Sequence, residues 1–208
     1  MSEFERPVCL PVLALRGLCV FPKMLTHFDV GRKSSMAAVE EALREDQQIF
    51  LVTQKDVETD HPKRNDLYTV GTVSIVKQVL RLPGENMRIL VEGQYRAELL
   101  DIVQSEPYLF GRMQKLEELP YNHSLPRVEA LLRQAHSQFE QFAELSGRNM
   151  QEALLRLLTS EDAGYTADFI GQDATFSYQN KQQLLGQLHP VKRLEQTLSL
   201  MAKELDIL

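Results

Sequence analysis

The spacing of apolar residues changes once along the 208-residue chain, near Leu119-Pro120, and this change limits the possible folds more than any other feature. Before it, short segments rich in Val, Ile, Leu and Phe are separated by Gly and Pro, a texture typical of β structure. After it, apolar residues recur every three or four positions, as they do along amphipathic helices. We therefore predict an α+β chain, with a β-rich subdomain over residues 1–118 and a helical bundle over residues 119–208.

The β-rich part contains the pattern of an antiparallel hairpin. Val73, Ile75 and Val79 fall on one face of an alternating run. The segment Leu82–Asn86, which includes a Pro-Gly pair, interrupts this run, and a second alternating run covers residues 87–92. Two alternating runs joined by a short turn predict a β-hairpin.

Two more elements are expected in the β-rich part. Residues 108–114 have the composition of a further strand. Residues 34–44 carry apolar side chains at helical spacing and predict the one helix of this part, with Ser34 or Ser35 as its N-cap.

The second part reads as a series of helices. Pro126 suits the first turn of a helix, and Gly147 suits its C-terminal end. A second helix is expected over residues 150–158, followed by shorter segments around 168–170 and 179–188.

The last apolar stripe begins at Val191 and continues to Leu208, where the sequence stops. A helix terminus usually offers Gly or Asn beyond its last periodic residue, and this one does not. We therefore expect either that a longer protein was divided within this helix, or that another subunit completes the helix.

Composition excludes several classes of protein. Lys and Arg number 23 and Asp and Glu 29, for a net charge of -6, and neither part of the chain is basic. This balance argues against nucleic acid as a partner, because neutralising phosphates requires a basic face. The longest apolar runs are four residues, too short for a membrane span or a signal peptide. We expect a cytoplasmic protein that does not enter a membrane.

No motif for bond chemistry is present. The sequence lacks a phosphate-binding loop, a dinucleotide fingerprint and a nucleophile elbow, and its five histidines lack metal-ligand spacing. Asp56, Glu58 and Asp60 alternate as calcium ligands can, but the required Gly and Glu do not follow. Cys9 and Cys19 lie in apolar flanks and are expected to be reduced and buried. We predict no catalytic, cofactor-binding or metal-binding residues.

Apolar side chains in expected surface turns are the remaining candidates for function. Met24 and Leu25 follow a predicted strand, and Leu82 and Met87 flank the predicted hairpin turn. Met is flexible and suits contact with varied apolar segments. We predict these four residues as a substrate-binding group; the alternative is that they fill the ends of the β core.

Several segments resemble the amino-terminal domain of the bacterial Lon proteases in order and spacing. They include LPVLALRGLCVFPKM, DVGRKSSMAAVEEAL, DLYTVGTVSIVKQVLRLP, ILVEGQYRAEL and KQQLLGQLHPVKRLEQTLSLMAKELDIL. One departure is Leu13-Ala14-Leu15-Arg16-Gly17, where that family often shows Leu-Pro-Leu-Arg-Asp.

The resemblance implies a PUA-like β-rich subdomain, then a helical bundle whose last helix continues into a coiled arm. In that family an ATPase module, which uses ATP and Mg, and a serine-lysine protease module follow, and neither lies in these residues. The resemblance thus implies a non-catalytic domain that needs no cofactor of its own. Its expected partners are unfolded, damaged or tagged proteins, the remaining Lon modules, and neighbouring subunits of a homohexamer.

Two other functions stay open at this point. PUA-like folds also occur in RNA-modifying proteins, and Arg81, Arg88, Arg96 and Arg112 could gather on neighbouring strands to bind RNA. The chain could also be a stand-alone regulatory protein that ends at Leu208.

Overall fold

The computed structural model describes residues 6–208. The chain divides into two compact units, one ending at Glu117 and one beginning at Glu118. This division lies one residue from the boundary expected between the two periodicities, and the assignment of residues 1–118 and 119–208 to two subdomains stays a prediction.

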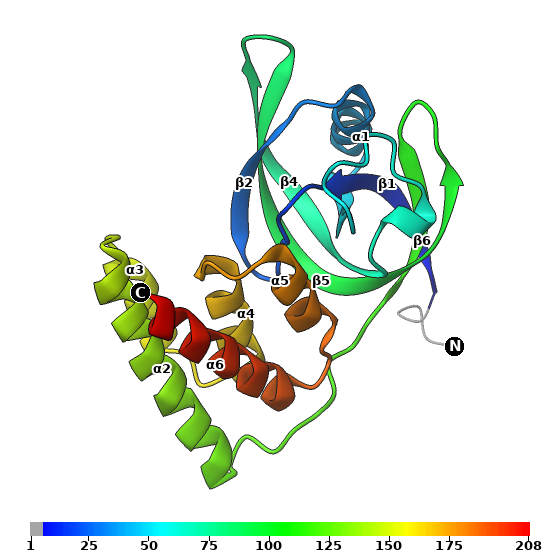
Figure 1. Ribbon diagram of the computed structural model, residues 1–208. Helices are drawn as coiled ribbons and strands as arrows, with labels where there is room; N and C mark the ends of the chain where they lie inside the picture. The colour runs from blue at the N-terminus through cyan, green and yellow to red at the C-terminus, as the bar shows by residue number, and fades with distance from the viewer. Residues whose placement is uncertain (1–5) are drawn as a thin grey trace. The chain divides into compact units, whose positions relative to one another are not determined.

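The first unit is built on a mixed sheet (Figure 1). Its strands are β1 (Val8–Leu15), β2 (Leu25–Val30), β3 (Gln48–Thr53), β4 (Val70–Leu82), β5 (Asn86–Gln104) and β6 (Leu109–Lys115). Their order is β2-β5-β4-β3-β1-β6, and β6 also pairs with β5, which closes five strands into a ring. The pairing of β1 with β3 is parallel, and β2 lies outside the ring on β5.

Helix α1 (Lys33–Arg44) packs its apolar face on this sheet. Ala38, Val39 and Ala42 are almost fully buried and join the core with side chains of β1, β3, β4 and β5. The prediction that Ser34 or Ser35 caps the helix is wrong. Both serines lie inside the first turn, and the N-cap is Arg32, which makes no capping side-chain hydrogen bond.

The predicted hairpin is confirmed, but the prediction that Val73, Ile75 and Val79 share one face of it is wrong. Strands β4 and β5 are antiparallel, and Leu82 pairs with Asn86 across the turn. Register shifts occur at Val73/Ser74 and Val76/Gln78. Because a bulge adds one residue to a strand, the side chains beyond it change face. Val76 and Val79 therefore contact the α1 core, while Ile75 is half-buried outside it.

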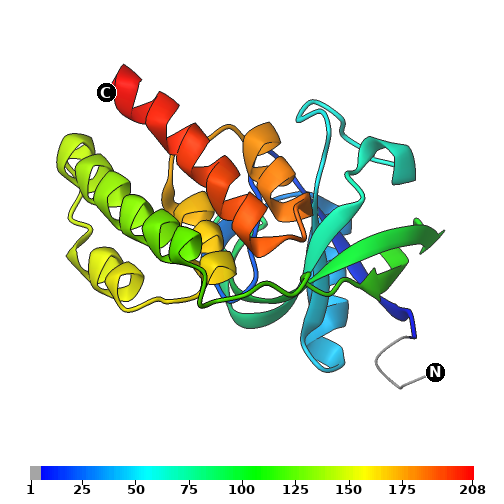
Figure 2. The same ribbon diagram turned by 90° about the horizontal axis from the view of Figure 1, so that it is seen from below.

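The second unit is helical (Figure 2). Its helices are α2 (Pro126–Ser146), α3 (Gln151–Leu158), α4 (Ala163–Asp173), α5 (Tyr178–Gly186) and α6 (Pro190–Ile207). Pro126 begins α2, and Gly147 ends it in the left-handed conformation, with φ of 65°, as predicted. Helix α4 is longer than expected, because eight of its residues are buried and no single apolar stripe marks it.

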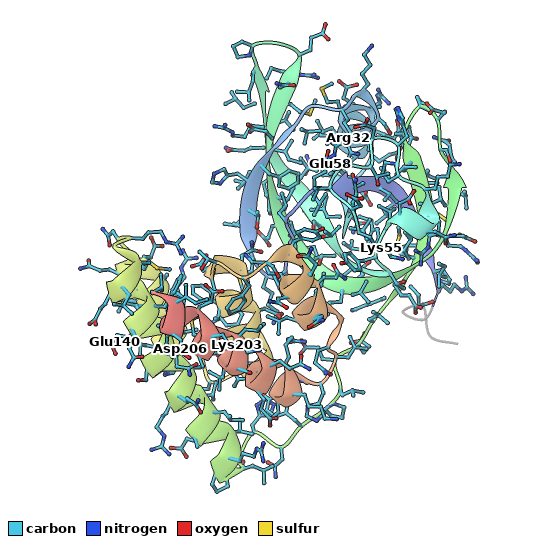
Figure 3. The ribbon with its side chains drawn as sticks, in the orientation of Figure 1. Arg32, Lys55, Glu58, Glu140, Lys203 and Asp206 are labelled. Atoms are coloured by element: carbon cyan, nitrogen blue, oxygen red, sulfur yellow. The ribbon has the colours of Figure 1, made fainter. Side chains whose placement is uncertain are left out.

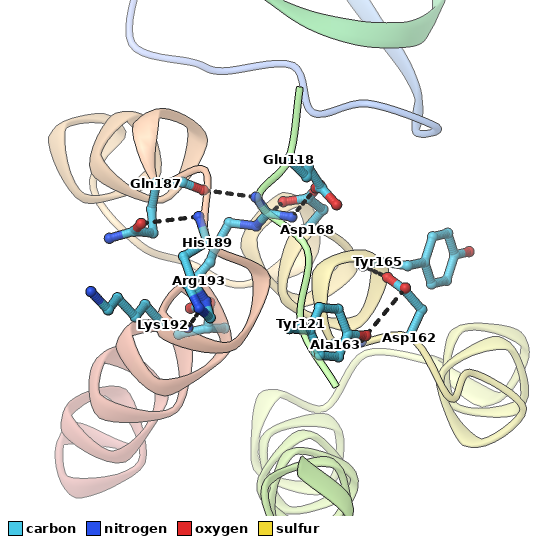
Figure 4. A network of polar contacts seen from close by, with 11 residues as sticks. Glu118, Tyr121, Asp162, Ala163, Tyr165, Asp168, Gln187, His189, Lys192 and Arg193 are labelled. Carbon is cyan, nitrogen blue, oxygen red and sulfur yellow. Dashed lines mark hydrogen bonds and ion pairs between the residues drawn. The ribbon is translucent and has the colours of Figure 1, made fainter. Parts of the chain in front are cut away.

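A buried cation organises the helical unit (Figure 4). Arg193 of α6 has no exposed surface, and its Nε lies 3.0 Å from Asp168 Oδ1 of α4. Its guanidinium also pairs with the Glu118 carboxylate and donates to Gln187 O at 2.8 Å. A buried charge is strongly destabilising without partners, so these contacts join α4, α6 and the segment before α2.

A second group of polar contacts holds the start of α4 (Figure 4). Asp162 Oδ1 accepts from Tyr165 N at 2.6 Å and so caps the helix. The Tyr121 hydroxyl accepts from Ala163 N at 2.9 Å and donates to Asp162 Oδ2 at 3.3 Å. Burial raises the pKa of the Tyr121 hydroxyl, so this residue stays a donor at neutral pH.

Candidate protein-binding surface

The sheet formed by β2, β5 and β4 has one face turned away from α1, which we call the outer face. Paired residues of an antiparallel sheet project on the same side, so the strand register defines this face. Three paired rows cross it: Leu25, Glu92 and Ile75; His27, Leu90 and Gln78; Asp29, Arg88 and Leu80. Leu82, which pairs with Asn86, extends the face toward the hairpin turn.

Leucines of the outer face are open to solvent. Leu25 is 57% exposed and Leu80 is 58% exposed, while Leu82 and Leu90 are half-buried. A sheet face covered by water normally carries polar side chains, so a set of leucines there indicates a contact surface.

A polar pair separates the leucines of the outer face. Arg88 Nε donates to Asp29 Oδ1 at 2.7 Å, and a second contact joins Nη2 to Oδ2 at 3.3 Å. This hydrogen bond lowers the pKa of the Asp29 carboxyl below its ordinary value. The outer face therefore combines apolar patches with a neutralised ion pair.

The opposite side of the same strands is core. Met87, Ile89 and Val91 alternate with the outer residues of β5, and each is fully buried. The contrast follows from the two-residue period of a strand, which sends neighbouring side chains to opposite faces.

The four residues predicted as a substrate-binding group are divided by this geometry. Met24 is 6% exposed and Met87 is fully buried, so their expected display at the surface is wrong. Met87 faces α1, and Met24 precedes β2, where its carbonyl accepts from Gly93 N at 3.0 Å. Leu25 and Leu82 do lie on the outer face.

Leu25 and Leu82 are nevertheless far apart. Their partners on β5, Glu92 and Asn86, are six residues apart, which corresponds to about 20 Å along a strand. Leu80 and Leu90, which were not among the predicted group, lie in the rows between them. The alternation of Met87 to Val91 could have identified Leu90, but no sequence signal marks Leu80 as exposed.

A groove adjoins Leu82 on the α1 side of the hairpin. It has a volume of about 320 Å³, and Met36 and Ala37 of α1 line it together with Leu82. Glu40 and Arg81, an ion pair with an Nη2 to Oε1 distance of 3.1 Å, also line the groove. An apolar side chain could therefore enter between the helix and the hairpin.

The four arginines that could have bound RNA do not form a basic face. Arg81, Arg88 and Arg112 are each paired with a carboxylate, from Glu40, Asp29 and Asp101 respectively. Arg96 is 3% exposed. Because a phosphate backbone needs accessible positive charge, this arrangement gives no support to RNA binding.

Other chemistry receives no geometric support from residues 6–208. They contain no group of three or more His, Cys, Asp or Glu side chains placed to hold a metal ion. Cys19 is buried with its Sγ 3.3 Å from Thr53 Oγ1, whereas Cys9 is exposed, contrary to the prediction from its apolar flanks. Cys9 pairs with the exposed Arg112 on the sheet, which places it on the solvent side. Within the same residues, no helix has both the length and the apolar content of a membrane span.

Residues 9–203 match the family model of the ATP-dependent protease La (LON) substrate-binding domain. The chain belongs to this family. The Lon protease of Heliobacterium modesticaldum is 41% identical over 199 residues, a match that covers 96% of this chain and 24% of that protein. The Lon protease of Desulforamulus reducens is also 41% identical, over 201 residues, with 95% and 24% covered. The chain thus spans about a quarter of the length of these Lon relatives.

Solved Lon structures have the same fold. The N-terminal domain of a Mycobacterium avium complex Lon protease has a TM-score of 0.72 at 21% identity, covering 94% of this chain and 98% of that one. A Lon N-terminal domain protein from Xanthomonas campestris has a TM-score of 0.65 at 15% identity, covering 92% and 98%. The predicted α+β class and the Lon resemblance are both confirmed.

Proposed function

We propose that this Lon domain captures unfolded or damaged protein segments through the outer face. The observation that carries the proposal is the position of Leu25 and Leu80, which are both more than half exposed on one sheet face of a substrate-binding domain. The leucines supply affinity through apolar burial, and the spacing of the rows suits side chains of an extended peptide.

The free edge of β2 offers a second means of capture. Among residues 6–208, β2 pairs with β5 and with no other strand. An edge strand presents main-chain N–H and C=O groups that can pair with an extended peptide, while neighbouring apolar side chains bind that peptide's own side chains. This mode accepts many sequences, as a domain that selects by unfolding must.

The energetics favour weak capture by one domain. Burying about 400 Å² of apolar surface contributes roughly 10 kcal/mol before losses, and most of it is lost to association and peptide ordering. We therefore expect micromolar or weaker affinity. Six copies in a ring would raise the effective concentration of sites and so hold a substrate much more tightly.

This role fits a longer protein. We infer that the parent is a cytoplasmic ATP-dependent serine protease for protein quality control under stress, whose ATP and Mg are bound outside these residues. The domain itself would perform no bond chemistry and would use no cofactor. It would also support assembly of a homohexamer together with the remaining Lon modules.

The proposal is tested by fluorescence anisotropy with a labelled, permanently unfolded protein. The test variant is Leu25→Ser with Leu80→Ser, and we expect it to weaken binding by roughly tenfold or more, a loss of about 1.4 kcal/mol. The matched control is Leu155→Ser with Leu158→Ser, which replaces two α3 leucines that are 65% and 58% exposed.

Comparing the two double variants shows which surface binds the unfolded protein. Weaker binding in the outer-face variant with an unchanged control supports the proposal. Unchanged binding in the outer-face variant contradicts it, and a loss confined to the control would move recognition to the helical unit.

A further inference from the structure

The ring of strands has an opening between β2 and the end of β1. Strand β5 pairs along one edge with β4, and along its other edge with β2, at Met87–Glu92, and then with β6, at Ala97–Gln104. Strand β6 continues to β1, but only as far as Val12. Leu13–Leu15 of β1 pair with β3 on one side, and within residues 6–208 no strand pairs with their other side. The wall of the ring is therefore incomplete between β2 and this part of β1.

An apolar cavity of about 340 Å³ lies in this opening. Its lining includes Leu13 and Leu15 from β1, Phe28 and Val30 from β2, and Leu18 from the segment that joins the two strands. All five side chains belong to the core beneath α1 or pack against it, and Leu18 and Phe28 are half-buried. An apolar side chain that entered the cavity would extend this core and leave water.

A side chain takes the place of a strand on the open side of β1. Arg32, which is labelled beside α1 in Figure 3, donates from Nη2 to Ala14 O at 2.7 Å. Its Nη1 donates to Asp60 O at 3.3 Å. Both acceptors are main-chain oxygens, so among the residues that the structure describes no carboxylate pairs with the Arg32 guanidinium.

The cavity has an excess of positive charge. Arg16 and Arg32 line it together with one acid, Asp29, whose carboxylate is already paired with Arg88. Arg16 is paired with the Asp60 carboxylate, at 3.1 Å. Burial lowers the pKa of the Arg32 guanidinium, and nearby Arg16 lowers it further, while Asp60 opposes both effects. A carboxylate supplied by a partner would therefore complement this cluster.

The free edge of β2 offers main-chain groups beside the cavity. Because β2 pairs only with β5 among residues 6–208, the N–H and C=O groups of its alternate residues point away from the sheet. A peptide that paired with this edge would send every second side chain to the face that carries Phe28 and Val30, where the cavity lies.

We propose that the cavity between β1 and β2 binds an apolar side chain of an extended peptide that carries an acidic residue two positions away. The peptide main chain pairs with the free edge of β2, its apolar side chain enters the cavity, and its carboxylate approaches Arg16 and Arg32. This inference rests on the proposed capture of unfolded segments. It adds a preference for an apolar and an acidic residue, which the outer face alone does not supply.

The test is fluorescence anisotropy of the 208-residue chain with labelled peptides of about eight residues whose ends carry no charge. The first peptide carries Leu and Asp two positions apart, the second has Lys in place of Asp, and the third has Ser in place of Leu. We expect the first peptide to bind about tenfold more tightly than either of the others. Equal binding of the three peptides overturns the proposal.

Two single variants locate the binding site. Ser35 of α1 lines the cavity and is 8% exposed, so Ser35→Leu should fill the space and weaken binding of the Leu-Asp peptide about tenfold. Arg16→Glu reverses an exposed charge and should abolish the preference for Asp over Lys. Because Arg16 is exposed, this second variant should keep its fold even if Ser35→Leu proves unstable in thermal unfolding.

Lys203→Glu is the control for Arg16→Glu, because it makes the same change of charge on an exposed residue of α6 that does not line the cavity (Figure 3). It should keep the preference for Asp and bind the Leu-Asp peptide within about twofold of the unchanged chain. An unchanged preference in Arg16→Glu, or an equal loss in Lys203→Glu, contradicts the proposal.

The double variant Leu25→Ser with Leu80→Ser separates this inference from the proposed function. If only the double variant loses capture of unfolded protein, while Ser35→Leu and Arg16→Glu bind every probe as the unchanged chain does, the cavity proposal fails and the outer-face proposal stands. If the double variant captures normally, while Ser35→Leu and Arg16→Glu lose the peptide preference, the cavity proposal stands and the outer-face proposal fails.

Discussion

The two faces of the β2–β5–β4 sheet use similar apolar residues for different purposes. On the α1 side, Met87, Ile89 and Val91 have no exposed surface. On the outer face, Leu25 and Leu80 keep more than half of theirs. Hydrophobicity alone thus does not distinguish a core residue from a binding residue; the distinction comes from what lies over each face.

The largest effect on stability is expected from a substitution on the α1 side of the sheet. Met87→Ala should lower the free energy of unfolding by about 2–5 kcal/mol, because it removes buried contacts and leaves a cavity. Chemical denaturation of the single variant measures this loss. Leu80→Ala is the matched control on the outer face and should change stability by less than about 0.5 kcal/mol. Equal losses would mean that the outer face is also covered.

The next effect concerns binding at the groove beside the hairpin. Leu82→Ser should weaken capture of an unfolded protein by roughly threefold, less than the double change at Leu25 and Leu80, because Leu82 is already half-buried in the free domain and has less apolar surface left to bury on binding. Anisotropy titrations of the two variants side by side compare them. A larger loss for Leu82→Ser would place the centre of the site at the groove of Met36 and Ala37.

The smallest effect concerns the ion pair of the outer face. The folded-state pKa of Asp29 is lowered, chiefly by its hydrogen bond from Arg88, so the contribution of this pair to stability is present above the ordinary value of 3.8. That contribution is lost as the pH falls through the lowered pKa. Asp29→Asn should therefore flatten the acid limb of the stability curve slightly and leave stability near neutral pH almost unchanged, as urea denaturation at several pH values would show. A large loss of stability in Asp29→Asn at neutral pH would contradict the conclusion that this exposed ion pair contributes little.

Most of the local structure could be predicted from the sequence because its signals are local. The Pro-Gly turn between β4 and β5, Pro126 at the start of α2 and Gly147 at its end act through their own backbone preferences. The extent of α4 could not be predicted in this way. Its buried residues surround the helix, so the period that identifies a surface helix is missing.

The candidate site could be predicted only in part, because exposure depends on distant residues. Leu25 and Met24 are neighbours in a similar apolar sequence, yet one is exposed and the other is buried. Leu82 and Met87 flank the same turn, yet Leu82 is half-buried and Met87 is fully buried. The bulge at Lys77 of β4 adds a further uncertainty, since it reverses the face that simple alternation assigns to Val79 and the residues beyond it.

The sequence by itself determined the α+β class, the hairpin, the helical second half and the Lon family of this chain, because these depend on periodicity, turn residues and the order of motifs. Only the tertiary structure decided which leucines are available to a partner and which methionines belong to the core. It also decided that β1, β2 and the start of α1 meet around one cavity. These properties arise when segments far apart in the chain pack together, and packing removes water from some side chains while leaving chemically similar ones exposed.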